Sequence, residues 1–153
     1  MAEVWFYHLE RRALEQVLPG MVEKSLERGW KVVIEAPGEE RVAALDAVLW
    51  TYSDESFLPH GTQRDNEPER QPVYLTAGAE NPNRAKVRFC VDGADPAAAL
   101  TIDGSYDRVA VLFDGNDDDA VALARRQWSA LKGTHHSRAY WQADENGRWA
   151  KKA

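Results

Sequence analysis

The residues best suited to chemistry lie near the end of the chain, at helical spacing. Arg125 and Trp128 are three positions apart and Lys132 follows four positions later, so all three share one side of a helix. Cationic side chains pair with carboxylates, and an indole ring lines an apolar cleft. This combination suits an acidic peptide that carries an aromatic residue. The alternative is a solvated helix face whose tryptophan caps the core, and both interpretations stay open.

Three consecutive apolar residues, Phe57, Leu58 and Pro59, indicate a second surface. They follow the polar segment 53–56 and precede His60. Pro59 restricts Leu58 to an extended conformation and donates no backbone hydrogen bond. The run either covers the edge of a sheet or displays an apolar patch for a partner protein.

Groupings typical of catalysis or metal binding are not recognisable in the sequence. His135 and His136 are adjacent but have no third ligand at useful spacing, so we interpret them as solvated loop residues. The acidic run at 117–119 suits the first turn of a helix. A single cysteine, Cys90, excludes an internal disulfide and lies in a strand-like segment, which predicts a buried, unreactive thiol. The sequence thus favours a protein without catalytic residues, metal or cofactor.

A nucleotide-binding site is the alternative that an α/β pattern invites. The sequence contains neither GxxxxGK[ST] nor GxGxxG, and the first expected turn, HLERRALEQ at 8–16, has no glycine. The second turn, APGEE at 36–40, has one glycine and two acids, which repel phosphate. A nucleotide-binding or hydrolytic enzyme would use the carboxyl ends of the strands, with His8 and the APGEE turn near its site.

Charge and hydropathy limit the classes of partner. The net charge of -6 opposes direct binding to nucleic acid, which depends on neutralising phosphates. No apolar run approaches the ~20 residues of a membrane span, and the start of the chain does not resemble a signal peptide. We therefore expect a cytoplasmic protein.

Hydrophobic periodicity predicts alternating strands and helices in one domain, residues 1–153. The alternation indicates a three-layer α/β fold, with a mostly parallel sheet, right-handed crossovers and helices on both faces. Residues 61–72 are expected to form a loop, and 134–153 a C-terminal arm or hairpin. Pro19 either starts the first helix or kinks it. The expected strands are 4–8, 30–36, 73–76, 86–91 and 108–113, and the main helices 13–29, 40–50 and 117–132.

Several stretches together resemble the chi-subunit family of bacterial DNA polymerase III, an accessory protein of the clamp loader. They are FYHL, ALEQVLPGMVEKSLERGWKVVIEA, LDAVLWTYSDESFLPHG, RVAVLFDG, ARRQW and YWQADENGRWAKKA, and they run almost from end to end. The most specific is LDAVLWTYSDESFLPHG at 45–61. The resemblance implies a nucleotide-binding-like fold without a phosphate loop, no bound nucleotide and no catalytic activity.

The resemblance also implies partners. Chi proteins pair with the psi subunit and bind the acidic, phenylalanine-ending tail of the single-stranded-DNA-binding protein. The psi surface would involve Phe57, in a segment that also holds Leu58, Pro59 and His60. A helicase-like repair protein is a further partner that the resemblance allows.

The tail-binding surface implied by the resemblance involves Arg125 and the aromatic residue three positions on, Trp128. Ser129 departs from the family pattern, because a basic residue is often found at this position. The cationic cleft is therefore expected to depend on Arg126 and Lys132 as well.

Overall fold

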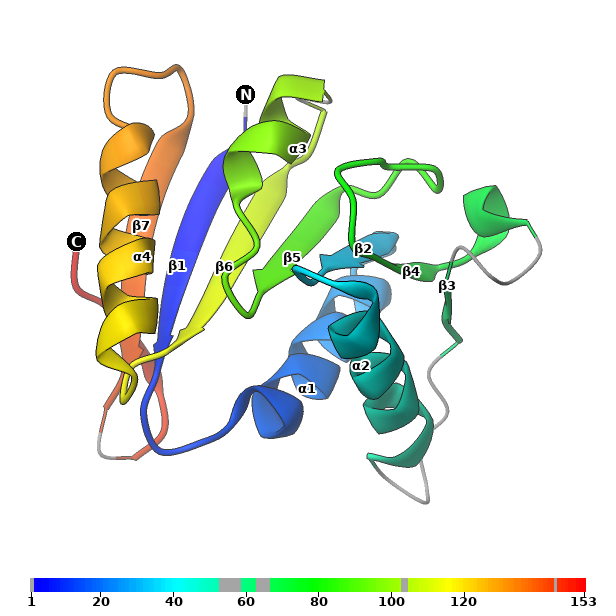
Figure 1. Ribbon diagram of the computed structural model, residues 1–153, viewed down its shortest axis with the longest axis horizontal. Helices are drawn as coiled ribbons and strands as arrows, with labels where there is room; N and C mark the ends of the chain where they lie inside the picture. The colour runs from blue at the N-terminus through cyan, green and yellow to red at the C-terminus, as the bar shows by residue number, and fades with distance from the viewer. Residues whose placement is uncertain (1, 53–58, 63–66, 103–104, 145) are drawn as a thin grey trace.

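An eight-stranded sheet forms the centre of the computed structural model, which describes residues 2–52, 59–62, 67–102, 105–144 and 146–153 (Figure 1). Its strand order is β3-β4-β2-β5-β6-β1-β7-β8. All neighbours are parallel except β7 and β8. The strands are β1 Glu3–Leu9, β2 Val32–Glu35, β3 Gly61–Thr62, β4 Val73–Thr76, β5 Val87–Val91, β6 Arg108–Asp114, β7 Ser137–Ala143 and β8 Trp149–Lys151.

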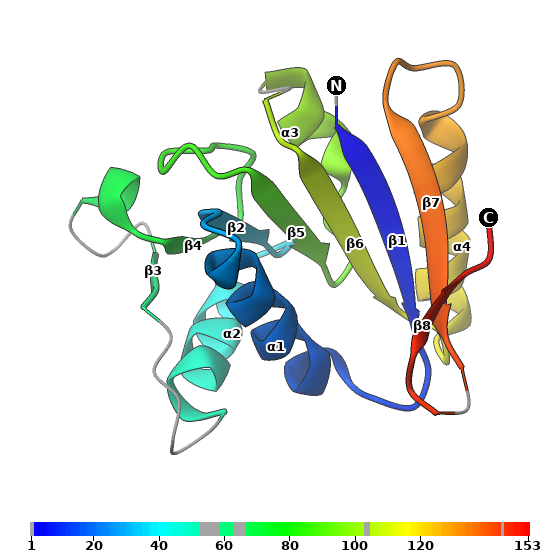
Figure 2. The ribbon, with the colours of Figure 1, turned by 180° about the vertical axis from the view of Figure 1, so that it is seen from behind.

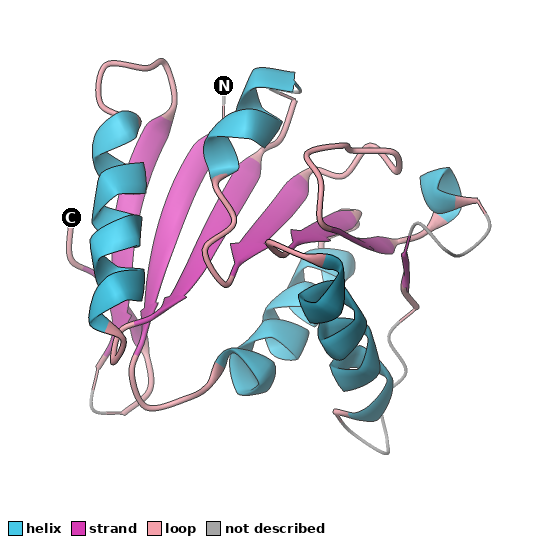
Figure 3. Ribbon diagram, viewed as in Figure 1, coloured by secondary structure: helices cyan, strands magenta, loops and turns pink. Residues whose placement is uncertain are grey.

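Helices cover both faces of the sheet, which confirms the predicted three-layer α/β architecture (Figure 3). One face carries α1, Leu14–Glu27, and α2, Glu39–Thr51. The other carries α3, Pro96–Ile102, and α4, Asp118–Ala130. A 3-10 turn, η1 Pro68–Arg70, precedes β4. Because each parallel connection must cross over the sheet, this arrangement follows from the alternation in the sequence.

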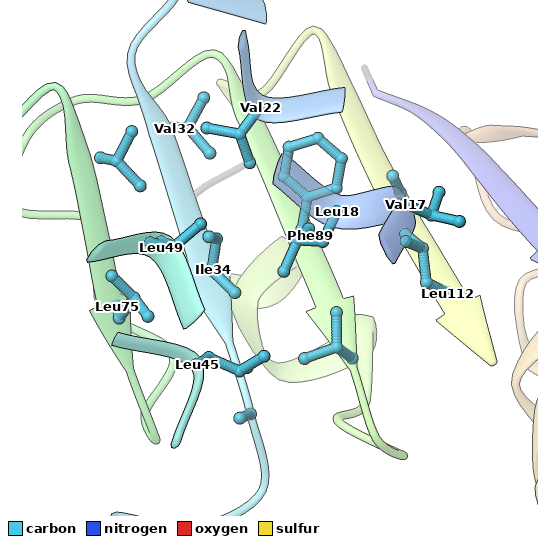
Figure 4. Packing of buried hydrophobic residues seen from close by; sticks show 14 of the residues in the cluster. Val17, Leu18, Val22, Val32, Ile34, Leu45, Leu49, Leu75, Phe89 and Leu112 are labelled. Carbon is cyan, nitrogen blue, oxygen red and sulfur yellow. The ribbon is translucent and has the colours of Figure 1, made fainter. Parts of the chain in front are cut away.

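The larger part of the core lies beneath α1 and α2. Val17, Leu18 and Val22 of α1 and Leu45 and Leu49 of α2 are buried against the sheet (Figure 4). The strands beneath them are apolar on both sides, as expected of a parallel sheet covered twice. The sheet residues that meet these helices include Ile34, Leu75, Phe89 and Leu112.

Two local features bear on the sequence predictions: Pro19 decides between two alternatives, and residues 61–62 differ from the predicted loop. Pro19 lies inside α1, which begins five residues earlier, so this proline does not start the helix. Gly61 and Thr62 form a short edge strand within the segment that was expected to be a loop. A Cβ atom at Gly61 would lie 2.8 Å from the Gln71 side chain, so a larger residue here would require that side chain to move.

A buried arginine connects the sheet to the loop after β4. Arg88 is fully buried, and its guanidinium hydrogen-bonds the Glu35 carboxylate. It also donates a 3.0 Å hydrogen bond to the Tyr106 hydroxyl and a 2.9 Å hydrogen bond to the carbonyl oxygen of Glu80. The charge is therefore paired and its donors are satisfied, which is the condition for burying an ion.

Candidate functional site

The helix α4 presents two arginines to solvent. The Asp117 side chain caps the helix by accepting hydrogen bonds from the backbone N–H groups of Asp119 and Ala120. The residues that face the sheet are Ala124, Gln127 and Leu131, all of them buried. Arg125 and Arg126 are exposed on the opposite side.

Trp128 is half-buried at the edge of this helix. Its ring meets Phe6 edge-on, with centroids 5.4 Å apart, and Tyr140 of β7 edge-on at 6.1 Å. The guanidinium of Arg138 lies over the indole, 4.3 Å from its centroid. Trp128 therefore packs against the sheet while part of its ring stays accessible, so it meets both requirements that the sequence left as alternatives.

Arg138 and Tyr140 are site residues that the spacing of α4 did not reveal. Both lie on β7, which runs parallel to β1 at the sheet's side next to α4 (Figure 1). Burial raises the pKa of Tyr140, while the nearby charge of Arg125 acts in the opposite direction. Tyr140 is held in place by a 2.6 Å hydrogen bond between its hydroxyl and Nδ1 of His8.

We call the group of Arg125, Arg126, Trp128, Lys132, Arg138 and Tyr140 the α4 surface. Arg125, Arg126 and Lys132 are exposed, and within the described parts of the chain none of these three makes an ion pair. Lys132 lies in the turn just beyond the C-cap residue Leu131. Cations without partners around an accessible aromatic ring can take carboxylates and an apolar side chain together.

The second predicted surface is described only in part. Phe57 and Leu58 lie outside the described residues. Pro59 is exposed, whereas the His60 side chain is 0% exposed. His60 Nε2 lies 3.1 Å from Oδ1 of Asp46, so this histidine fastens the segment to α2.

Trp50 adds a large exposed aromatic side chain beside this segment. It is 52% exposed, and its ring lies 4.4 Å from the His60 ring, centroid to centroid. The exposure of Trp50 could have been predicted from helical spacing, because Trp50 directly follows Leu49 of the buried stripe and so points away from the sheet. We call the surface formed by Trp50 and Pro59 the α2-end surface.

A cleft of about 600 Å³ opens where the carboxyl ends of β1 and β6 meet. It lies at the switch point of the sheet, since the helices after these two adjacent strands cover opposite faces. Neither His8 nor the APGEE turn lines it, contrary to the arrangement expected for a nucleotide site. The charged residues that line the cleft are mainly acidic, so the cleft repels phosphate. They are the cations Arg11 and Arg12 and the acids Glu10, Glu15, Asp92, Asp114, Asp117 and Asp119.

Two other side chains that could take part in chemistry, Cys90 and His136, belong to the packing of the fold. Cys90 is buried, which confirms that part of the prediction, and burial raises the pKa of its thiol to about 12. His136 accepts a 3.1 Å hydrogen bond from the backbone N–H of Ala2 and connects the last strands to the first.

Among the described residues, no group of three or more side chains could hold a metal ion. None of the helices described is both long and apolar enough to span a bilayer.

Comparison with known families identifies the chain. A family model described as "DNA polymerase III chi subunit, HolC" matches residues 1–138. The chain belongs to the chi-subunit family of DNA polymerase III. This finding confirms the family resemblance that the sequence showed.

A curated relative of this chi-family chain comes from Rickettsia prowazekii (strain Madrid E). It is named "Probable DNA polymerase III subunit chi" and is 31% identical over 102 residues. That match covers 67% of this chain and 62% of the relative. The chain thus spans less than two thirds of the relative's length.

A solved structure has a similar fold. The C-terminal domain of the DEAD-box protein Dbp5 superposes with a TM-score of 0.53 over 91% of both chains. The two sequences are 13% identical, so this similarity concerns the fold alone. It agrees with a nucleotide-binding-like α/β architecture, while the acidic cleft of the chi-family chain lacks a phosphate loop.

Proposed function

We propose that this chi-family protein is a non-catalytic adaptor of the DNA polymerase III clamp loader. It joins the psi subunit, through the α2-end surface, to the acidic C-terminal tail of the single-stranded-DNA-binding protein, through the α4 surface. In this role it works in the cytoplasm during DNA replication. A helicase-like repair protein is a further expected partner.

One observation carries the proposal: Arg125, Arg126 and Lys132, which make no ion pair with any described residue, lie on or just after the helix that carries the half-buried indole of Trp128, in a protein of net charge -6. Arg125 and Arg126 offer paired charges for the carboxylates of a tail peptide. The ring of Trp128, held by Phe6 and Arg138, offers a flat apolar contact for its phenylalanine. Local positive charge on an acidic protein favours an acidic peptide over a long polyanion such as DNA.

The psi surface is supported by exposure near the end of α2. Trp50 is one of two large apolar side chains, among those described, that are strongly exposed. Its ring lies 4.4 Å from that of His60, the residue after Pro59, and an exposed indole of this kind is typical of the centre of a protein interface. Phe57 and Leu58 belong to the same proposed surface by the family resemblance, and His60 supports it from beneath.

Calorimetry on the full chain tests the tail-binding half of the proposal. A synthetic acidic peptide ending in phenylalanine should bind with micromolar affinity, which corresponds to roughly 8 kcal/mol. Binding should weaken as salt rises, because exposed charges are screened. Absence of binding at low salt would refute this half.

Co-purification tests the psi half separately. The full chain, expressed together with psi from the same genome, should elute with psi as a one-to-one complex. A thermal-shift screen with nucleotides addresses the alternative enzyme. Clear stabilisation by any nucleotide would contradict the adaptor interpretation.

A further inference from the structure

A second aromatic groove lies on the face of the sheet opposite α4. It is hollowed between α1 and the β7–β8 hairpin and has a volume of about 290 Å³ (Figure 2 looks onto this face). Four of the six tryptophans of the chain line it. They are Trp5, Trp30, Trp141 and Trp149.

Aromatic rings in the walls of the groove pack against one another. Trp5 and Trp141 have centroids 4.9 Å apart, and Tyr7 meets Trp149 edge-on at 5.0 Å. All four tryptophans are half-buried, so each is fixed by the core and still presents part of its ring. An apolar side chain entering the groove would find a preformed surface and would lose little free energy to ordering it.

Every charged residue that lines the groove is a cation. They are Lys24, Arg28 and Arg108, in a chain whose net charge is -6. The Arg108 guanidinium lies 3.6 Å from the Trp5 ring centroid, and that of Arg28 lies 5.3 Å from the Trp30 centroid. Stacking on indoles keeps both guanidinium groups positioned for an incoming anion.

Two hydrogen-bond donors in the groove lack acceptors. Nε of Arg108 and Nε1 of Trp141 are buried and find no hydrogen-bond partner among the described residues. Nη2 of Arg108 forms an ion pair with the Glu3 carboxylate at 3.8 Å. Because Nε of Arg108 and Nε1 of Trp141 are covered by surrounding atoms, a carboxylate or a peptide carbonyl of a partner would satisfy them once the rim side chains shift.

The groove is separate from the α4 surface in space, although Tyr140 and Trp141 are neighbours on β7. The two lie on opposite faces of the sheet. Trp141 and Trp149 come from residues beyond the stretch 1–138 that matches the chi-family model. The groove therefore depends on a part of this chain that the family match does not include.

We propose that this groove binds a short acidic segment of a further partner protein. An aromatic or aliphatic side chain of the segment lies against the indoles, and a neighbouring carboxylate pairs with Arg108 and Arg28. Three cations suit one or two carboxylates. A longer polyanion would have to continue over a surface that is acidic on the whole, so charge favours the peptide over single-stranded DNA.

Indole signals in a proton–nitrogen spectrum of the full, nitrogen-15-labelled chain provide a site-resolved test. The probe is a peptide Glu-Asp-Phe-Asp-Glu with both ends capped, so that it has no terminal carboxylate. Addition of the peptide should shift the indole signals of Trp5, Trp30, Trp141 and Trp149. The signal of Trp50, which lies elsewhere, should not move, and a shift of Trp128 would report separate binding at the α4 surface, which Arg125→Ala should remove without affecting the groove signals.

Substitutions at the rim test the charge pairing. Arg28→Ala and Lys24→Ala remove exposed cations without disturbing the core, and each should weaken the peptide about three- to tenfold. Arg70→Ala is the matched control, because it removes an exposed cation from η1, which is not part of the groove. Its affinity for the peptide should equal that of the wild type.

Three results would overturn the proposal. The first is the absence of indole shifts in the groove at about 1 mM peptide, a concentration that detects even weak binding. The second is a shift confined to Trp128, which would place the peptide on the α4 surface. The third is a stronger response of the groove signals to single-stranded oligothymidylate than to the peptide, which would make the groove a nucleic-acid site.

Discussion

Arg138 of β7 holds Trp128 of α4 by two contacts at once: its guanidinium lies 4.3 Å from the indole centroid, and its Nη1 donates a 2.6 Å hydrogen bond to the Trp128 carbonyl oxygen. That carbonyl lies in the last turn of the helix, where it also accepts a 3.3 Å hydrogen bond from the backbone N–H of Leu131. The contact therefore supports the end of α4 and fixes the ring that the proposed tail site uses. One strand residue thus links the stability of the helix end to recognition.

Arg125→Ala should remove tail-peptide binding without changing the fold. Arg125 is exposed and makes no ion pair among the described residues, so its loss should change the free energy of unfolding by less than about 0.5 kcal/mol. Peptide affinity should fall at least tenfold, since a charge-assisted hydrogen bond is lost. Fluorescence anisotropy with a labelled peptide measures this, and Arg70→Ala is the control. Unchanged affinity in Arg125→Ala would remove Arg125 from the site.

Arg138→Ala should affect both stability and peptide binding. Removing the hydrogen bond and the cation–π contact should cost about 1–2 kcal/mol in urea unfolding. Because the indole is no longer held in place, the affinity for the tail peptide should also fall about three- to tenfold. Arg138→Lys, which keeps the charge but loses the planar stack, should recover only part of either effect. If Arg138→Ala binds the peptide as well as the wild type, the positioning role is wrong.

Phe57→Ala and Trp50→Ala should each weaken co-purification with psi and leave tail-peptide binding unchanged. Trp50 is 52% exposed, so its truncation should change the free energy of unfolding by under about 1 kcal/mol. Ile102→Ala is the matched control, because Ile102 is also strongly exposed but lies on α3. Psi recovered at wild-type yield from both variants would contradict the α2-end surface.

Arg88→Met should destabilise the protein by about 3–5 kcal/mol, because it leaves the Glu35 carboxylate largely buried without a partner. The double variant Arg88→Met with Glu35→Leu should recover a large part of this loss. Urea unfolding followed by tryptophan fluorescence gives both values. Equal destabilisation in the single and double variants would show that Arg88 acts through its contacts to Tyr106 and the Glu80 carbonyl instead.

Stability should fall as the pH rises above about 9. Burial raises the pKa of Cys90 to about 12, and burial likewise raises that of Tyr7 to about 12. The ordinary pKa values are about 8.5 for a cysteine and about 10 for a tyrosine, so the unfolded chain loses these protons first. Since the unfolded state then binds fewer protons than the folded state, stability is full below the unfolded pKa and decreases above it.

Urea midpoints at about pH 8 and pH 10 measure this loss. Cys90→Ala removes one of the groups, so its midpoint should fall less between the two values. A thiol reagent should modify Cys90 only as fast as the protein unfolds. Rapid modification of the folded protein would show that the thiol is not sealed.

The sequence predicted those parts of the site that depend on local periodicity. The strands β1, β2, β4, β5 and β6, the main helices and the exposure of Arg125 follow from spacing along the chain, because helices and strands repeat over a few residues. The burial of Cys90 followed in the same way from its apolar strand.

Contacts between distant segments were not predictable. Arg138 and Tyr140 reach the α4 surface only because β7 pairs with β1, and local spacing does not specify that pairing. Gln127 is buried and its side chain donates to the carbonyl oxygen of Gly93, although a polar residue at this position suggests a solvated face. His60 is covered by α2, a packing that a loop histidine in the sequence does not indicate.

The central place of β1 has a consequence for biosynthesis. Glu3 pairs with Arg108 and Ser137, so β1 leaves the ribosome well before both of the strands that pair with it. Until then, the nascent chain carries an apolar strand with two open edges, which is the kind of segment that chaperones protect. Truncation before β7 would leave one of these edges permanently bare, and such fragments should aggregate.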